Sequence, residues 1–326
     1  MRWQRRWLRL PRREMRDWVH LRSAGAWREP AGQQPRRVSD LRHSDCQGLA
    51  APGSPLSTAA SGLLRVNLLQ GKAIATQFQI RVGEASLEQH ARLVLGGLLG
   101  SVDATSRVRT FDLSVEGDQN GFSNLLSDLT YAAIADSEGS LLLHAGAVAN
   151  ADGGTAVLCG PSGSGKSTLT TRLVRAGFHY VTDETVCAHP VSLRIEYFRR
   201  PVSLKPGSPL ALRGDWPSIQ KRALRSGECW FVPPDDLGGA PAPTSPLWPA
   251  LFVFPTFVSG APCAVERLTE AHTAFLLGQN SSRLRQIAQG PLATLSRAAR
   301  RAPGFEVRFG SVDDAADAVA DLLHAS

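Results

Sequence analysis

The chain has 326 residues, 43% of them hydrophobic and 20% charged, which is ordinary for a folded protein long enough to bury a large core. The formal net charge of +7 comes from residues 1–50, which hold twelve Arg and five acidic residues, whereas the rest of the chain holds 24 basic and 24 acidic residues. A neutral remainder without a basic stripe argues against a nucleic-acid-binding protein.

Cysteine usage and hydropathy indicate the compartment. The five cysteines are odd in number, widely spaced and form no C-x-x-C pair, so neither a disulfide framework nor a structural zinc site is expected. No apolar stretch reaches the ~18 residues of a membrane span, and the Arg-rich start is not followed by the apolar segment of a signal peptide. We therefore expect a cytoplasmic protein without stable membrane insertion.

The composition divides the chain into three segments. Residues 1–61 are rich in Arg and Trp and then in Pro, Gly, Ser and Ala, which predicts a disordered basic extension. The alternative is an amphipathic basic helix that contacts a membrane surface or a partner. Residues 62–139 predict a small α/β lobe, and residues 140–326 predict the nucleotide-binding domain described below.

Hydrophobic periodicity predicts the elements of these two parts in chain order. In the small lobe the expected strands are 63–69, 76–82 and 107–116, and the expected helices are 87–99 and 121–135. In the larger part the expected strands are 141–149, 156–159, 179–182, 185–189, 194–198, 229–232, 251–254 and 305–309. The expected helices there are 168–176, 269–279, 289–301 and 312–323, the last with Ser311 as its N-cap, and residues 208–249 are expected to be loops around the strand at 229–232.

The strongest motif is a glycine-rich loop between a buried strand and a helical pattern. It satisfies G-x-x-x-x-G-K-[ST], with one further hydroxyl residue behind it: Gly160, Pro161, Ser162, Gly163, Ser164, Gly165, Lys166, Ser167 and Thr168. Glycines let successive backbone N–H groups turn inward as an anion nest at a helix N-terminus. Lys166 would reach the β- and γ-phosphates and the Ser167 hydroxyl would bind Mg²⁺, so ATP and Mg²⁺ are the expected cofactors.

Two carboxylates follow the next short strand. Asp183 and Glu184 lie just past YVT, 17 residues after Lys166. An acidic residue at such a strand end can bind Mg²⁺, and another can orient or deprotonate the nucleophile. Adjacent side chains on a strand point to opposite faces, so the two are expected to have different tasks. The alternative is an ordinary Asp-Glu turn.

Further candidates lie on either side of this motif. His144 interrupts the apolar strand expected to pair with the strand before the loop, and it is either a core histidine or a group that contacts Asp183 or a phosphate. Arg199, Arg200 and Lys205 are either solvated surface charges or contacts to a phosphate or an acidic acceptor.

The pattern LLLHAGAV, GPSGSGKSTL and YVTDE resembles the HPr kinase/phosphorylase family and the related kinases encoded with lasso-peptide and other peptide-modification genes. The resemblance, strong over residues 140–207, implies phosphorylation of a serine hydroxyl, with Asp183 as base, Glu184 near the metal, and His144 and the loop as further site positions. It also implies a fold similar to the nucleotide-binding core of phosphoenolpyruvate carboxykinase. Glu184 replaces the second aspartate of the true HPr kinases, and the segment that binds HPr has no counterpart here, which argues against HPr as acceptor. The R-P-[VI]-x-L-K segment of the peptide-cluster branch matches Arg200 to Lys205.

The sequence therefore predicts an α/β protein with a P-loop kinase core, a mixed sheet flanked by helices, that transfers the γ-phosphoryl group of ATP to a hydroxyl of a peptide or protein. Arg200 and Lys205 are its candidate substrate or phosphate contacts. A small-molecule hydroxyl kinase and a non-catalytic, ATP-gated peptide-binding module remain as alternatives. Because the true HPr kinases assemble as hexamers, the resemblance also allows a homo-oligomer.

Overall fold

The computed structural model describes residues 67–103, 105–113, 120–206 and 214–326, all of which belong to one unit. The expected basic extension, residues 1–61, lies outside the described residues. So does the beginning of the first expected strand.

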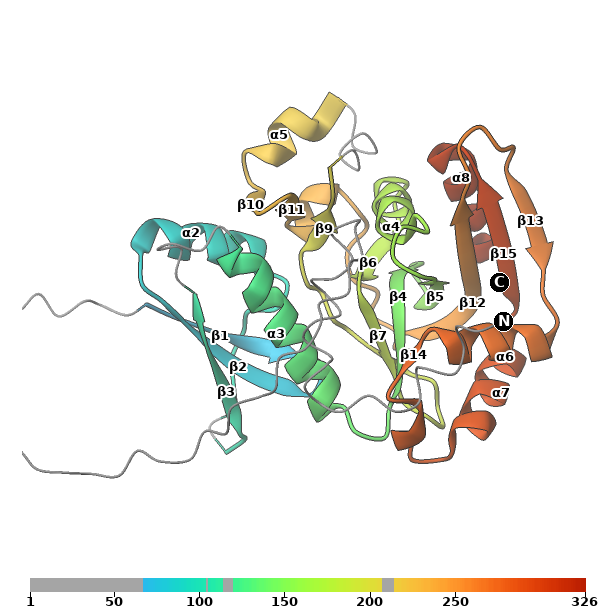
Figure 1. Ribbon diagram of the computed structural model, residues 1–326, viewed down its shortest axis with the longest axis horizontal. Coiled ribbons are helices and arrows are strands. Elements are labelled where there is room, and N and C mark those ends of the chain that lie inside the picture. Colours follow the sequence, from blue (N-terminus) through green and yellow to red (C-terminus); the bar gives the residue numbers. More distant parts are fainter. Residues whose placement is uncertain (1–66, 104, 114–119, 207–213) are drawn as a thin grey trace, which may run out of the picture. The chain divides into compact units, whose positions relative to one another are not determined.

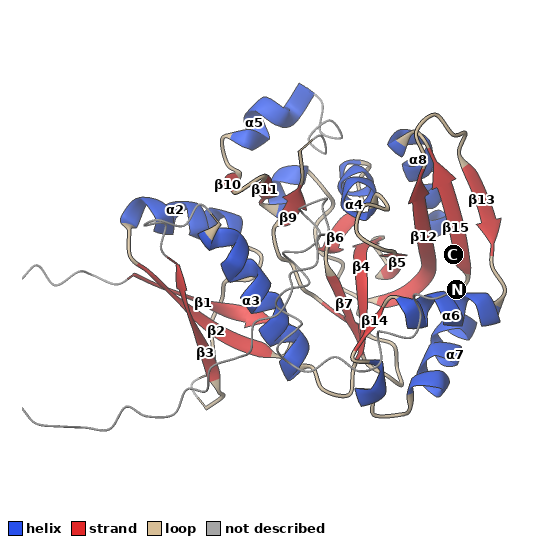
Figure 2. Cartoon of the chain, in the orientation of Figure 1, coloured by secondary structure: helices blue, strands red, loops and turns tan. Residues whose placement is uncertain are grey.

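The protein is a mixed α/β structure with a large mixed sheet flanked by helices (Figures 1 and 2). The strands of this sheet are β4 (Leu141–Ala149), β5 (Gly154–Cys159), β6 (His179–Thr182), β7 (Thr185–Ala188), β8 (Ile195–Glu196), β12 (Trp248–Phe257), β13 (Ala264–Arg267), β14 (Ser281–Ser282) and β15 (Gly304–Phe309). The order is β13-β15-β12-β5-β4-β7-β8, and β6 and β14 also pair with β4. β5, β12 and β15 run parallel to one another, whereas β4 is antiparallel to β5.

Helices cover both faces of this sheet because its central strands are apolar on both sides. In β5, Ala156 and Leu158 face a core shared with α4 (Lys166–Arg175) and α8 (Val312–His324). Val157 and Cys159 face the opposite core, which includes α6 (Glu270–Gln279) and α7 (Pro291–Arg301).

The start of α8 confirms one prediction from the sequence. The Ser311 hydroxyl accepts a hydrogen bond from the Asp314 amide, which confirms Ser311 as the N-cap of α8. Short 3₁₀ turns cover Pro234–Leu237 and Leu284–Gln286. Among the helices in the described part of the chain, none combines the length and apolar character needed to cross a bilayer.

The small lobe is a three-stranded sheet with two helices, as the sequence predicted. Its elements are β1 (Asn67–Ala73), β2 (Thr76–Val82), β3 (Val108–Leu113), α2 (Ala85–Val94) and α3 (Gly121–Asp136). β2 pairs antiparallel with β1 and parallel with β3. The apolar core of the lobe also includes Leu142, Cys187, Phe198 and Phe231 from the rest of the chain, so the lobe is packed onto the larger sheet.

The expectation that residues 208–249 are loops around one strand is wrong. The described part of this segment contains α5 (Trp216–Gln220) and β10 (Leu224–Ser226) besides β11 (Cys229–Val232), and β12 begins at Trp248. β10, β11 and the unpredicted β9 (Val202–Leu204) form a small antiparallel sheet in the order β10-β11-β9. Elements this short have almost no periodic signal, and their apolar side chains are buried only by distant partners.

Other boundaries also differ from those expected. The strand expected over residues 194–198 is only Ile195–Glu196, because the chain then leaves the sheet and buries Phe198 in the core of the lobe. The helix expected over residues 87–99 ends at Val94, two residues before Gly96, the first of two consecutive glycines. The strands β13 and β14 were not predicted.

β4 is the strand around which the large sheet is organised. Its carboxyl half pairs with β5 on one edge and β6 on the other, and its amino half pairs with β7 and β14. Gly146, in the middle of β4, is so close to α4 that a Cβ atom there would lie 2.3 Å from the Thr170 hydroxyl oxygen. The helix that follows the glycine-rich loop therefore packs directly on the backbone of β4.

We expect Gly146→Ala to lower the free energy of unfolding by about 1–3 kcal/mol, because the added methyl group overpacks the contact with α4. Thr170 is fully buried, and its hydroxyl has no hydrogen-bond partner among the described residues, so Thr170→Ala in the same chain should recover part of the loss. Urea unfolding measures both effects. Gly83→Ala is the matched control, because a Cβ atom there meets nothing within 4 Å. If Gly146→Ala cost no more than this control, the tight contact would be contradicted.

Candidate active site

The glycine-rich loop lies between β5 and α4, in the strand–loop–helix order that the motif requires. Gly163 and Gly165 have φ angles of 87° and 98°, a left-handed region that glycine adopts at little cost. At Gly165 a Cβ atom would also come within 2.9 Å of the Phe309 ring. Gly163 therefore needs glycine for its conformation alone, since a Cβ atom there would meet nothing within 4 Å, whereas Gly165 needs it for both conformation and space. The resulting turn leads into Lys166, the first residue of α4.

The side chain of Lys166 folds back over this loop. Its Nζ donates hydrogen bonds to the carbonyl oxygens of Gly160 at 2.7 Å and Pro161 at 2.9 Å. Burial lowers the pKa of Lys166, and the nearby carboxylates Glu184 and Asp183 raise it in part. The ammonium group is thus held at the amino-terminal half of the loop by two carbonyls that a phosphate group could replace.

The pairing of β4 brings the two carboxylates next to the loop. β6 and β7 pair one after the other along the same edge of β4, and Asp183 and Glu184 occupy the break between them. The amide of Ala145 donates to the carbonyl of Glu184 at 3.2 Å at this break. On the opposite edge of β4, Ala145 pairs with Cys159, the residue before the glycine-rich loop. One residue of β4 therefore lies between the loop and the carboxylates.

Asp183 is buried and incompletely hydrogen-bonded. The residue is only 3% exposed. Its Oδ2 accepts a hydrogen bond from the Ser203 amide at 3.4 Å, whereas its Oδ1 has no hydrogen-bond partner among the described residues. Burial raises the pKa of Asp183 to about 7, with Glu184 adding to the rise, while Arg200, the Ser167 hydroxyl and the Ser203 amide act in the opposite direction. Asp183 is thus the carboxylate beside Ser167.

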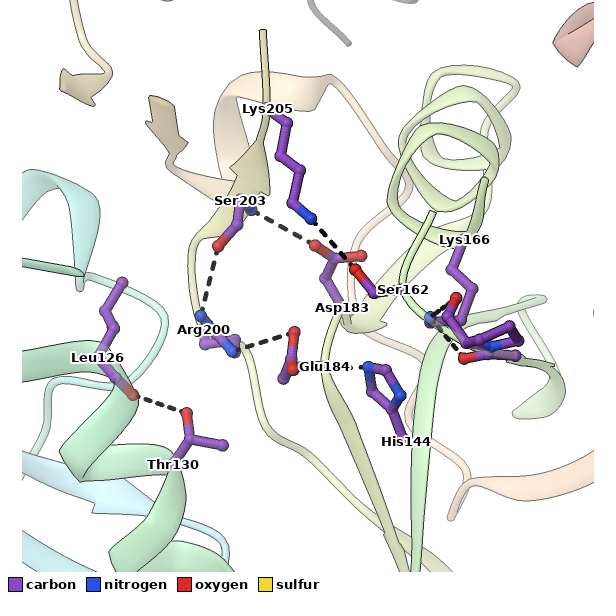
Figure 3. A network of polar contacts seen from close by, with 12 residues as sticks. Leu126, Thr130, His144, Ser162, Lys166, Asp183, Glu184, Arg200, Ser203 and Lys205 are labelled. Carbon is purple, nitrogen blue, oxygen red and sulfur yellow. Dashed lines mark hydrogen bonds and ion pairs between the residues drawn. The ribbon is translucent and has the colours of Figure 1, made fainter. Parts of the chain in front are cut away.

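Glu184 lies between two basic side chains, as Figure 3 shows. Its carboxylate is 3.6 Å from His144 Nε2 and 3.6 Å from Arg200 Nη1, and 43% of the side chain is exposed. The sequence left His144 as either a core histidine or a group that contacts Asp183 or a phosphate. In the structure its side chain is partly exposed and lies beside Glu184, the neighbouring carboxylate. The expected difference between the two acids is present: Asp183 is enclosed, and Glu184 is accessible.

Arg200 is a buried arginine at the edge of the cluster. It is 7% exposed, its Nη2 donates to the Ser203 hydroxyl at 3.3 Å, and its carbonyl accepts from the Tyr180 hydroxyl at 2.8 Å. Its neighbour Arg199 instead pairs with Asp235 at 2.7 Å. The structure thus directs Arg200, and not Arg199, toward the two carboxylates.

Lys205 reaches the loop from the end of β9. Its Nζ donates to the Ser162 hydroxyl at 3.1 Å (Figure 3). The structure therefore gathers most of the predicted candidates into one cluster, namely the glycine-rich loop, His144, Asp183, Glu184, Arg200 and Lys205.

Sequence reasoning missed two contributors to this cluster. The Ser203 amide contacts Asp183, but a backbone donor on an unpredicted strand leaves no sequence signal. Tyr131, on α3 of the small lobe, lies near enough that Glu184 raises the pKa of its phenol, although burial is the larger cause. The only sequence signal for Tyr131 is an aromatic residue with a hydroxyl group on a helix that mixes polar and apolar residues.

The residues fit a magnesium ion that arrives with a phosphate ligand. Within the described ranges there is no group of three or more His, Cys, Asp or Glu side chains that could hold a metal ion by itself. Mg²⁺ usually needs only one or two carboxylates, with phosphate and water oxygens completing its shell. The unpartnered Oδ1 of buried Asp183, beside the Ser167 hydroxyl, is the kind of oxygen such an ion would take.

Two comparisons with known proteins give no relatives: no family model matches this chain, and a search of the curated proteins finds no match.

The burial of Asp183 predicts a pH-dependent cost in stability. Its folded-state pKa of about 7 lies above the ordinary value of 3.8, so between these two values the folded protein binds a proton that the unfolded chain does not. The free energy of unfolding must then fall as pH rises through this window. Above pH 7 it is lower by roughly 2–4 kcal/mol.

We expect Asp183→Asn, in metal-free buffer, to raise the melting temperature at pH 8 but hardly at pH 4.5, because the amide has no proton to lose. Thermal unfolding across this range measures the difference. The exposed residue Asp152 provides the control, since Asp152→Asn should leave the pH profile unchanged. A variant profile parallel to that of the wild type would contradict the assignment.

Proposed function

We propose that this protein is an ATP- and Mg²⁺-dependent kinase of the HPr-kinase-like class that phosphorylates a serine or another hydroxyl on a peptide or protein. One observation carries the proposal: β4 brings Asp183 and Glu184 beside a glycine-rich loop of the phosphate-binding type. The finer fold that goes with this proposal is a P-loop kinase core similar to the nucleotide-binding domain of phosphoenolpyruvate carboxykinase. A cytoplasmic location and a homo-oligomeric state remain predictions from the sequence.

The chain's own groups account for the transfer as follows. The loop amides and Lys166 bind and orient the phosphates. The phosphate oxygens then take the place of the loop carbonyls that accept hydrogen bonds from Lys166 here. A carboxylate takes the proton of the acceptor hydroxyl. The oxygen of that hydroxyl bonds to the γ-phosphorus, and the bond from this phosphorus to the bridging oxygen of ADP breaks. Mg²⁺, when bound, neutralises charge on the phosphate oxygens, and Ser167 with one carboxylate would hold it.

The two carboxylates can divide these tasks in two ways. The resemblance predicts Asp183 as the base and Glu184 as the metal ligand, and the raised pKa of Asp183 suits a base at neutral pH. The contacts favour the reverse, because Asp183 is the carboxylate beside Ser167 and has an unpartnered oxygen. Glu184 is the more accessible of the two and is positioned by Arg200 and His144.

Metal binding and transfer, measured separately, test both the function and this division. With radiolabelled ATP, the purified full chain and the peptides encoded beside its gene as acceptors, we expect labelled peptide from the wild type. Asp183→Asn and Glu184→Gln should each reduce transfer by roughly a hundredfold or more. The variant that loses Mn²⁺ binding in the presence of nucleotide identifies the metal ligand, and the other identifies the base.

The controls decide between the remaining functions. Asp152→Asn, in the exposed turn before β5, should transfer at the wild-type rate. Label on free serine or a sugar without any peptide would indicate a small-molecule hydroxyl kinase. ATP binding that Lys166→Ala abolishes, with no labelled product from any acceptor, would instead indicate a nucleotide-gated binding module. Transfer undiminished in both acid variants would contradict the proposed site.

A further inference from the structure

The segment from Arg200 to Lys205 contacts three separate parts of the candidate site. Arg200 pairs with Glu184, the Ser203 amide donates to Asp183, and Lys205 donates to Ser162 of the glycine-rich loop. Ser203 is the middle residue of β9, and Arg200 and Lys205 lie just outside its two ends. The segment therefore links the loop to both carboxylates and provides a second cation beside Lys166.

A packed element fixes the position of Lys205. Val202 and Leu204 are fully buried in the core that also contains Leu169 and Leu173 of α4, the helix that begins with Lys166. β9 also pairs with β11. Because side chains alternate along a strand, burial of residues 202 and 204 directs Ser203 and Lys205 to the other face, toward the loop.

The charge of Lys205 has no acidic partner in the described part of the chain, where no carboxylate lies within 4.0 Å of its ammonium group. Its contact in the site is the neutral Ser162 hydroxyl. The charge of Lys205 also lowers the pKa of Lys166, though less than burial does. Two ammonium groups thus approach one loop and repel each other, an arrangement that an anion bound between them would relieve.

The contact at Ser162 indicates which phosphate would lie there. In loops of this type the amides at the start of the helix hold the inner phosphates. Ser162 lies in the earlier part of the loop, four residues before Lys166, the first residue of α4. The ammonium group of Lys166, which reaches the outer phosphates in such loops, bonds to Gly160 and Pro161, next to Ser162. A triphosphate bound to this loop would therefore have its outer end near Lys205.

We propose that Lys205 binds the terminal phosphoryl group of a nucleoside triphosphate and so distinguishes ATP from ADP, while Arg200 positions Glu184. This rests on the proposed function. Lys205 keeps its proton throughout, since it only donates hydrogen bonds to oxygens of the phosphoryl group. In the transfer, the bond from phosphorus to the ADP oxygen breaks, the bond to the acceptor oxygen forms, and the acceptor's proton goes to the carboxylate.

Equilibrium binding of a non-hydrolysable ATP analogue and of ADP, each with Mg²⁺, tests this without any acceptor. Lys205→Met should weaken binding of the analogue roughly ten- to a hundredfold, the usual range for a hydrogen bond to a charged group, and change ADP binding less than threefold. Lys205→Arg should retain part of the discrimination. Lys221→Met, at another exposed lysine, is the matched control and should change neither affinity.

The outcomes separate this inference from the proposed function. Equal weakening of analogue and ADP, or no weakening of either, would overturn the role of Lys205 even if the protein phosphorylates peptides. An unchanged analogue-to-ADP ratio with a higher KM for the acceptor would likewise overturn it, since Lys205 would then bind an acidic acceptor. A third outcome is that the wild type distinguishes the analogue from ADP, Lys205→Met does not, and the wild type transfers no phosphate. This would support the inference about Lys205 and contradict the proposed kinase activity. A chain that binds no nucleotide would contradict both.

Discussion

The hydrogen bonding of β4 along both of its edges determines where every group of the candidate site lies. β5 delivers the glycine-rich loop on one edge, while β6 and β7 on the other edge place a two-residue break at the same height. A slip of one residue in either pairing would turn every side chain of the shifted strand to the opposite face. The close packing of α4 on Gly146 opposes such a slip, because the helix and the strand fit at one register. Loop, helix and carboxylates are therefore positioned by a single strand.

The parts of this arrangement that have local causes could be predicted from the sequence. The glycines of the loop, the apolar runs of β4 and β5, and the N-cap Ser311 each have a signal within a few residues. In the small sheet only β11 was predicted, whereas β9 and β10 have no such signal, since each has three residues. β9 also depends on pairing with residues of β11 that lie 26 to 30 positions further along the chain. The contacts of Arg200 and Ser203 with the carboxylates follow from that sheet, so the sequence indicated candidate residues there but not their partners.

The site combines charges that the folded protein does not fully compensate. Asp183 is enclosed with an unpartnered oxygen, and two lysines converge on one loop. Each feature lowers the free energy of unfolding, and burial of the apolar cores on both faces of the sheet must offset this cost. A magnesium ion with a triphosphate would supply the missing partners of opposite sign. The free-energy cost in the free protein is thus of the kind expected where binding groups are preorganised for a charged ligand.

The small lobe and the carboxylates are connected by a very short length of chain. Phe198 is buried in the core of the lobe, and Arg200 pairs with Glu184. The carbonyl oxygen of Arg199, between them, lies so close to Gly97 that a Cβ atom there would be 2.6 Å away. Two residues cannot absorb much displacement, since each spans at most about 3.6 Å. A shift of the lobe core that moves Phe198 must therefore move Arg200, and the orientation of Glu184 depends on how the lobe is packed. The lobe is in this way part of the support of the site.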